Sequence, residues 1–222
     1  MTASVITISA SVGAGGSLVG PAVADGLGLA FVDRVLPAAV AASLDVSLRQ
    51  ALAHDDKAPS VLARVLSKLG AASLPYGATP VPGDEPVFDE QVFRTKTEQV
   101  IQETASKEGA VILGRAAAVV LAGRPETLHV RLDGDREARI ERVKARQSMD
   151  TVAATRFVDD GDRARETYVR HFYKADAHDA RLYHLTIDSV VLPLETCAEM
   201  IIQAAKAIPP PGAAPASSTD PA

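Results

Sequence analysis

Several residue types are scarce or missing in this chain, and each absence narrows what it can do. Trp and Asn are absent, and aromatic residues make up 4% of the 222 residues. The core must therefore be built mainly from Val, Leu, Ile and Ala. Cys197 is the only cysteine, which excludes an intramolecular disulfide and a cysteine-rich zinc site. A single cysteine also suits a reducing compartment.

Long apolar runs and a surplus of positive charge are missing as well. No stretch approaches the ~20 apolar residues that a membrane-spanning helix needs. The first residues lack a basic segment followed by an apolar run, so no signal peptide is predicted. The formal net charge of −5 argues against a nucleic-acid partner, although a local arginine cluster could still bind a small anion. We expect a cytoplasmic protein without a membrane or nucleic-acid partner.

Short apolar segments alternate with longer segments of helical spacing. The segments that read as buried strands are Val5–Ile8, Leu29–Val32, Ala110–Leu113, Thr127–Leu132 and Leu182–Ile187. This alternation predicts an α/β fold with three layers, α/β/α, around a five-stranded parallel sheet. Ligands of such sheets bind beyond the carboxyl ends of the strands.

The chain reads as one domain over residues 1–208 and a tail. Residues 35–69 read as helices, and residues 73–87 read as a long loop rich in proline and glycine. Residues 209–222 are rich in Pro and Ala and are expected to be a disordered tail. Pro21 lies early in the first predicted helix, where it predicts a kink or a late helix start.

A glycine-rich turn follows the first predicted strand. Its backbone N–H groups at the start of a helix could bind phosphate, and its serine hydroxyl could bind Mg²⁺; the residues concerned are Gly13, Ala14, Gly15, Gly16 and Ser17. In the full pattern, G-x-x-x-x-G-K-[ST], Ala10 stands at the first glycine and Gly16 at the lysine. Without that lysine, another cation has to compensate for the lost charge. The alternative is a turn that only lets strand and helix pack closely.

Arginines occupy two kinds of position that suit an anion site. Arg34 and Arg115 each directly follow a predicted strand, where a surface ion pair is the alternative. Between about residues 139 and 176, two predicted helices carry basic stripes: Arg139, Arg142 and Arg146 on the first, and Arg163, Thr167, Arg170 and Lys174 on the second. Such stripes predict a lid over polyphosphate, because arginine is the better phosphate ligand. A solvated helical hairpin is the alternative, since acidic residues are interleaved.

Several motifs, taken together in order and spacing, resemble a known family. They are V-I-T-I-S-A-S-V-G-A-G-G-S, L-G-L-A-F-V-D-R, V-I-L-G-R, D-R-E-A-R-I-E-R-V-K-A-R, R-H-F-Y-K-A-D and Y-H-L-T-I-D-S. This set is similar to the cytidylate kinase-like family, a branch of the nucleoside monophosphate kinases among the P-loop NTPases. The resemblance covers residues 5–205. It implies transfer of the γ-phosphoryl group of ATP–Mg²⁺ to a nucleoside monophosphate such as CMP or dCMP.

The resemblance also implies roles for individual residues. The donor phosphates would be held by Gly13, Ala14, Gly15, Gly16, Ser17 and Arg146, with Ser17 also binding the metal ion. The acceptor nucleotide would be held by Asp33, Arg34 and Arg115. The arginines that neutralise charge during transfer would be Arg115, Arg142, Arg163 and Arg170. No side-chain base is needed in such enzymes, because positioning and charge neutralisation carry the catalysis.

Two departures from the family pattern keep other hypotheses open. Cytidylate kinases carry Asp after the Gly-Arg pair and Lys in the phosphate loop, whereas this chain has Ala116 and Gly16. A second hypothesis is therefore a degenerate kinase-like protein that binds nucleotide, regulates or scaffolds, and turns over little or nothing. A third is an interaction domain without a ligand, for which replacing the predicted lid arginines would change only surface charge.

Overall fold

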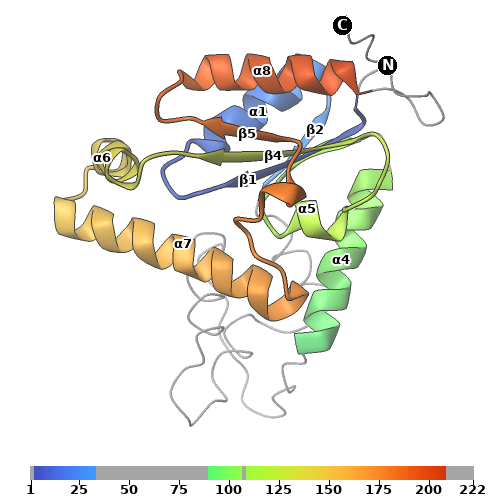
Figure 1. Ribbon diagram of the computed structural model, residues 1–222, viewed down its shortest axis with the longest axis horizontal. Coiled ribbons are helices and arrows are strands. Elements are labelled where there is room, and N and C mark those ends of the chain that lie inside the picture. Colours follow the sequence, from blue (N-terminus) through green and yellow to red (C-terminus); the bar gives the residue numbers. More distant parts are fainter. Residues whose placement is uncertain (1–2, 34–89, 107–108, 209–222) are drawn as a thin grey trace, which may run out of the picture.

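The computed structural model describes residues 3–33, 90–106 and 109–208. Within these ranges, parallel strands form one sheet in the order β2-β3-β1-β4-β5 (Figure 1). The strands are β1 (Val5–Ala10), β2 (Ala30–Val32), β3 (Ala110–Leu113), β4 (Thr127–Asp133) and β5 (Leu185–Asp188). The predicted parallel sheet is therefore confirmed, with β1 at its centre.

Helices cover both faces of this sheet. They are α1 (Gly16–Leu27), α4 (Glu90–Ser106), α5 (Ala117–Val120), α6 (Arg136–Gln147), α7 (Thr151–Tyr173) and α8 (Leu194–Ala207), with a 3₁₀ turn η1 (Ala180–Leu182) before β5. Figure 1 shows α1 and α8 on one face and α4 and α5 on the other, which confirms the three-layer α/β/α architecture. The α6–α7 hairpin begins beyond the carboxyl end of β4.

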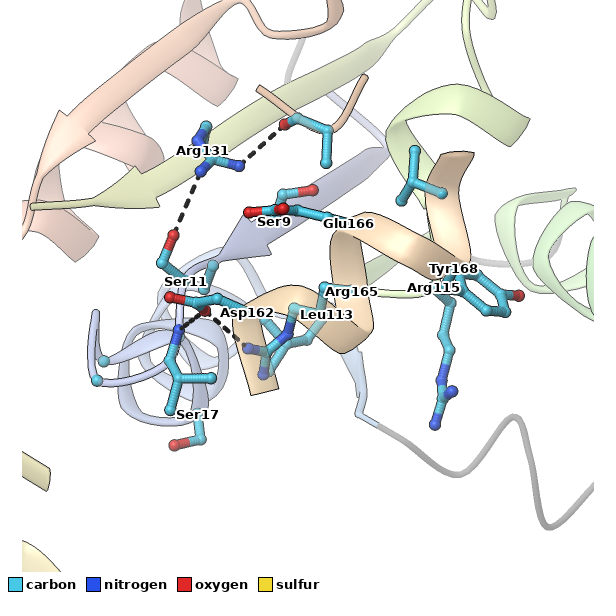
Figure 2. Close-up of a pocket in the computed structure, with 18 of the residues that line it drawn as sticks. Ser9, Ser11, Ser17, Leu113, Arg115, Arg131, Asp162, Arg165, Glu166 and Tyr168 are labelled. Carbon is cyan, nitrogen blue, oxygen red and sulfur yellow. Dashed lines mark hydrogen bonds and ion pairs between the residues drawn. The ribbon is translucent and has the colours of Figure 1, made fainter. Parts of the chain in front are cut away.

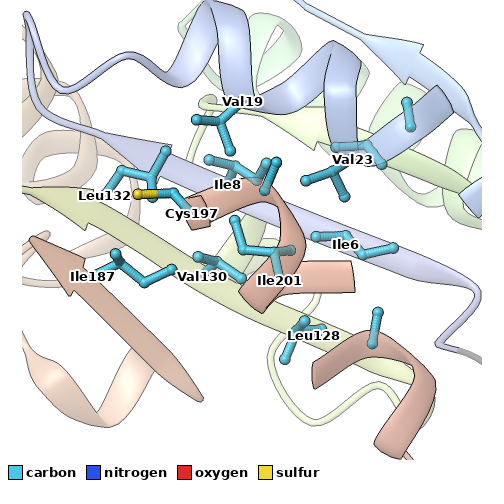
Figure 3. Packing of buried hydrophobic residues seen from close by; sticks show 14 of the residues in the cluster. Ile6, Ile8, Val19, Val23, Leu128, Val130, Leu132, Ile187, Cys197 and Ile201 are labelled. Carbon is cyan, nitrogen blue, oxygen red and sulfur yellow. The ribbon is translucent and has the colours of Figure 1, made fainter. Parts of the chain in front are cut away.

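Alternate residues of the central strands face the two helical layers. Ile6 and Ile8 of β1 pack with Val130 of β4 against α1 and α8 (Figure 3). Val5 and Ile112 belong to a second buried cluster with α4 and α5. A strand buried on both faces has to be apolar at nearly every position, which explains the continuous apolar runs in the sequence.

Two sequence-based predictions of where an element begins differ from the structure by more than one residue. Of the kink or late helix start predicted from Pro21, the late start does not occur, because α1 begins at Gly16 and continues through Pro21. Proline removes one N–H donor, but buried Val19 and Val23 hold the helix against the sheet. The last strand begins at Leu185 rather than at Leu182, because Asp179 accepts the Arg181 N–H at 3.0 Å and caps the η1 turn.

Some predictions lie outside the described residues and stay predictions. They concern Arg34, the helices at residues 35–69, the loop at residues 73–87 and the tail at residues 209–222. Among the helices that the structure describes, none combines the length and apolar character needed to cross a bilayer.

Candidate phosphate-binding site

A cavity of about 410 Å³ lies at the carboxyl ends of β1, β3 and β4, where ligands of parallel sheets are expected. The turn after β1 forms one part of its lining, and Arg115 after β3 forms another (Figure 2). Side chains of α6, of α7 and of the segment between α7 and β5 also belong to the described lining. Segments far apart in the sequence therefore meet at one site.

The turn after β1 presents backbone N–H groups at the start of α1. Gly13 and Gly15 take left-handed φ angles of 85° and 82°, which favour glycine, and Gly15 caps the helix without a side-chain bond. Among the described residues, no acceptor bonds the N–H groups of Gly13, Gly15, Gly16 and Ser17. Unsatisfied amides at a helix N-terminus form an anion-binding site. The structure therefore provides the amide cradle that the glycine pattern predicts.

The carbonyl groups of the same turn point to donors on other elements. The Val12 carbonyl accepts Arg139 Nη1 at 2.8 Å, the Gly13 carbonyl accepts Arg142 Nη1 at 3.3 Å, and the Ala14 carbonyl accepts Ser189 Oγ at 2.7 Å. These bonds hold successive peptide planes in one orientation. The amides are consequently in place before any anion binds.

The two departures from the phosphate-loop pattern are sterically linked. A Cβ atom at Gly16 would lie 2.7 Å from the Ala10 Cβ and 3.0 Å from Leu113 Cδ1. The Ala10 methyl group therefore fills the space that a side chain at position 16 would need. The usual phosphate-loop pattern has glycine at the position of Ala10 and lysine at the position of Gly16. This chain instead carries a methyl group at position 10 and no side chain at position 16.

The structure brings together most of the predicted site residues. Gly13, Gly15, Gly16, Ser17, Asp33, Arg115, Arg142 and Arg146 all line the cavity. Ala14 is buried and does not line it, because its N–H donates to the Ser11 carbonyl at 3.0 Å. Ala14 therefore shapes the turn instead of facing the ligand.

The predicted basic stripe of α7 does not line the cavity. Arg163 and Arg170 are both exposed and lie outside its lining. The residues of α7 that line the cavity are instead Phe157, Asp162, Arg165, Glu166, Tyr168 and Val169. The rotation of α7 about its own axis, and so which residues face the cavity, is set by its buried apolar residues. They are Ala154, Val158, Ala164, Tyr168, Val169 and Phe172. The lid prediction for these two arginines relied on a neighbouring, solvent-exposed face of the helix.

Arg165 and Asp162 lie over the turn after β1 (Figure 2). Asp162 Oδ1 accepts the Val12 N–H at 2.7 Å and lies 3.4 Å from Arg165 Nη1. Sequence analysis did not select either residue. The signal that could have found them is the apolar phase of α7, since both lie near Val158 and Val169 on its surface.

Arg131 is a further cavity residue that sequence analysis did not select. It lies in β4 with 9% of its side chain exposed and donates to Ser11 Oγ at 3.2 Å (Figure 2). It also donates to Asp133 Oδ2 at 2.7 Å. Burial opposes its charged form, but the hydrogen bonds and charge of Asp133 outweigh burial and raise the pKa of Arg131. The available signal was an arginine placed between Val130 and Leu132 in a strand that was predicted to be buried.

The cytidylate kinase-like family matches residues 5–190. The chain belongs to this family. A cytidylate kinase from Methanopyrus kandleri is 32% identical over 115 residues, which cover 48% of this chain and 56% of that protein. The chain therefore spans just over half the length of the curated relative it matches.

A solved structure supports the fold of this cytidylate kinase-like protein. The crystal structure of an uncharacterized protein from Eubacterium ventriosum aligns with a TM-score of 0.63 at 19% identity, covering 91% of this chain and 98% of that chain. At this identity the likeness shows the shared fold alone. The same arrangement of sheet and helices therefore occurs in a distant protein.

The described site suits phosphate groups better than a protein-held metal ion. The amide cradle and the surrounding arginines match the charge of a polyphosphate. Ser17 is exposed and lines the cavity, so its hydroxyl is available to a metal ion. Within residues 3–33, 90–106 and 109–208, no group of three or more His, Cys, Asp or Glu side chains could hold one. Mg²⁺ at this site would depend largely on phosphate oxygens.

The segment after β3 holds Arg115 in an uncommon backbone conformation. Gly114, Arg115 and Ala116 take successive left-handed φ angles of 79°, 60° and 55°. Each non-glycine residue in this region costs roughly 1 to 3 kcal/mol, and such strain clusters at ligand sites. This turn aims Arg115 at the cavity from the side opposite Ser17 (Figure 2).

Proposed function

We propose that this protein transfers the γ-phosphoryl group of ATP–Mg²⁺ to a nucleoside monophosphate, with CMP and dCMP as the first acceptors to test. The observation that carries this proposal is a single cavity lined by both the amide cradle of α1 and the strained Arg115 turn after β3. Phosphoryl transfer needs two phosphate groups held in line, and this cavity offers a cationic or amide contact for each. Family membership supports the same reaction class.

Each residue has a role in this proposal. The N–H groups of Gly13 and of Gly15 to Ser17 bind the donor phosphates, and Arg165 neutralises their charge in place of the missing lysine. Arg115 binds the acceptor phosphate, with Asp33 at the same cavity. Mg²⁺, bound through phosphate oxygens and the Ser17 hydroxyl, would supply further charge neutralisation. Arg142 acts through the backbone, because it donates to the carbonyls of Gly13 and Ser189.

Nucleotide binding with little or no turnover is the second candidate. Gly16 in place of lysine favours it, because this change removes a cation that stabilises charge during transfer, and Ala116 departs from the aspartate of cytidylate kinases. Such a protein would serve as a regulator or scaffold. A cytoplasmic location stays a prediction from the single cysteine.

One assay separates the candidates. ADP formation from ATP–Mg²⁺ is measured with CMP, dCMP, UMP and AMP for the wild-type protein, Arg115→Ala and Arg181→Ala. Arg181 is the matched control, because 90% of its side chain is exposed and it lies outside the cavity lining. We expect acceptor-dependent ADP formation that falls at least about 100-fold in Arg115→Ala and is unchanged in Arg181→Ala.

The possible results decide between the proposals. Saturable ATP binding without ADP formation for any acceptor would favour the non-catalytic candidate. Absence of both binding and turnover would contradict both candidates. Equal loss of activity in the two arginine variants would remove the role given to Arg115.

A further inference from the structure

The phosphate-binding turn is anchored in the α6–α7 hairpin by the side chain of Val12. Val12 is 8% exposed and packs in a buried cluster with Ile140, Val143, Ala154 and Val158. A Cβ atom at Gly161 of α7 would lie 2.6 Å from Val12 Cγ2. Only glycine at position 161 lets the turn approach the helix this closely.

Hairpin side chains also bond both backbone polar groups of Val12. Its N–H donates to Asp162 Oδ1 at 2.7 Å, and its carbonyl accepts Arg139 Nη1 at 2.8 Å. The same Arg139 nitrogen lies 2.6 Å from Asp162 Oδ2, which closes a ring of bonds around one peptide segment. Exposed fractions of 9% for the Arg139 side chain and 22% for that of Asp162 mean that water screens this ion pair only in part.

We propose that Asp162, with Arg139 and Gly161, forms a clamp on Val12 that holds the phosphate-binding turn in its anion-receiving shape before ligand arrives. Asp162 is thus a positioning residue. The clamp compensates for the missing lysine, because amides that are already aligned lose less entropy on binding an anion. This inference rests on the proposed function only in taking the anion to be a nucleotide phosphate.

The charge of Asp162 makes the proposal testable, because the clamp and simple electrostatics predict opposite changes in anion affinity when Asp162 is replaced. A carboxylate beside an anion site weakens anion binding by repulsion, so electrostatics alone predicts that Asp162→Ala tightens it. The clamp predicts the opposite, because the Val12 N–H loses its acceptor and the turn loosens. Gly161→Ala changes no charge. Helix propensity alone predicts that it stabilises α7, whereas the clamp predicts displacement of Val12.

The affinity for pyrophosphate and for ATP is measured by calorimetry on the full chain, with thermal melts to establish that each variant is folded. We expect Asp162→Ala and Gly161→Ala each to weaken binding about tenfold, equivalent to about 1.4 kcal/mol. Asp160→Ala is the control, since it removes the same charge from an exposed position of α7 outside the cavity lining. Its affinity should stay within about twofold of wild type. Tighter binding by Asp162→Ala would overturn the clamp.

Amide hydrogen exchange measured by NMR tests the clamp without any ligand. The Val12 N–H should exchange slowly in the ligand-free wild type and at least about tenfold faster in Asp162→Ala. Rapid exchange in the wild type would overturn the proposal. Polyphosphate binding without ADP formation would count against the kinase reaction alone. If the wild type binds neither polyphosphate, the proposed function fails and the Val12 exchange rate decides the clamp.

Discussion

The linked departures at Ala10 and Gly16 lead to a prediction for four proteins: wild type, Ala10→Gly, Gly16→Lys and the double variant. Gly16→Lys alone forces a Cβ atom to 2.7 Å from the Ala10 Cβ, closer than side-chain carbons approach. Ala10→Gly removes that obstacle. The two substitutions should therefore be coupled, and the double variant should restore a lysine to the phosphate-binding turn.

The magnitudes follow from the local packing. Ala10→Gly loses a methyl contact worth roughly 0.8 kcal/mol and adds the entropy cost of a strand glycine, roughly 0.5 to 1 kcal/mol. Gly16→Lys overpacks the turn at a cost of roughly 1 to 3 kcal/mol. The double variant removes the closest contact and leaves the flexible end of Leu113 at 3.0 Å, so its free energy of unfolding should exceed the additive value by roughly 1 to 3 kcal/mol. The restored ammonium should tighten pyrophosphate binding by about tenfold.

Urea unfolding of the four proteins at one salt concentration gives the coupling energy, and calorimetry with pyrophosphate gives the affinity. Two results would refute the reasoning. The first is a Gly16→Lys variant as stable as the wild type, which would mean that the Ala10 methyl group yields freely. The second is strict additivity, which would mean that the two positions do not share the space.

Three further predictions concern stability. Ser148 caps α6 in a left-handed conformation with φ of 51°, so Ser148→Gly should raise the free energy of unfolding in urea by about 1 kcal/mol; no gain would contradict this. Asp150 caps α7 by accepting an amide at 2.8 Å, so Asp150→Ala should lower stability by about 1 kcal/mol and Asp150→Asn much less. Burial and nearby His184 lower the pKa of His129 from 6.5 to about 4. The neutral form of His129 therefore contributes up to about 3 kcal/mol to the free energy of unfolding above pH 6.5, and this contribution is lost as pH falls toward 4. His129→Gln should make the free energy of unfolding less dependent on pH over this range. An unchanged pH profile in this variant would refute the prediction.

The strands were predictable because burial on both faces leaves a continuous apolar run. Ala110–Leu113 was predicted with both of its boundaries, and the strands at Val5 and Thr127 with their first residues. The last strand was predicted to begin at Leu182 but begins later. The residues there could form a strand, but the side-chain cap of Asp179 stabilises a 3₁₀ turn instead. Sequence patterns report average burial and miss such single hydrogen bonds.

The site was predictable where it depends on position along a strand. Gly13 to Ser17 and Arg115 follow strand ends, and parallel strands bring those ends to one edge of the sheet. Residues on α7 were not predictable in the same way. A shift of two positions along a helix moves a side chain to another face, as happened when Arg163 was preferred to Arg165.

The sequence by itself determined the order of strands and helices, the amide cradle and the family, because these depend on residues close together in the chain. Tertiary structure alone decided what holds the cradle in shape. Val12 and Asp162 are 150 positions apart, and Ala14 and Ser189 are 175 positions apart. No local pattern encodes such pairs, because they form only when the sheet and both helical layers have packed. Their geometry determines which arginines line the cavity and which hold the backbone.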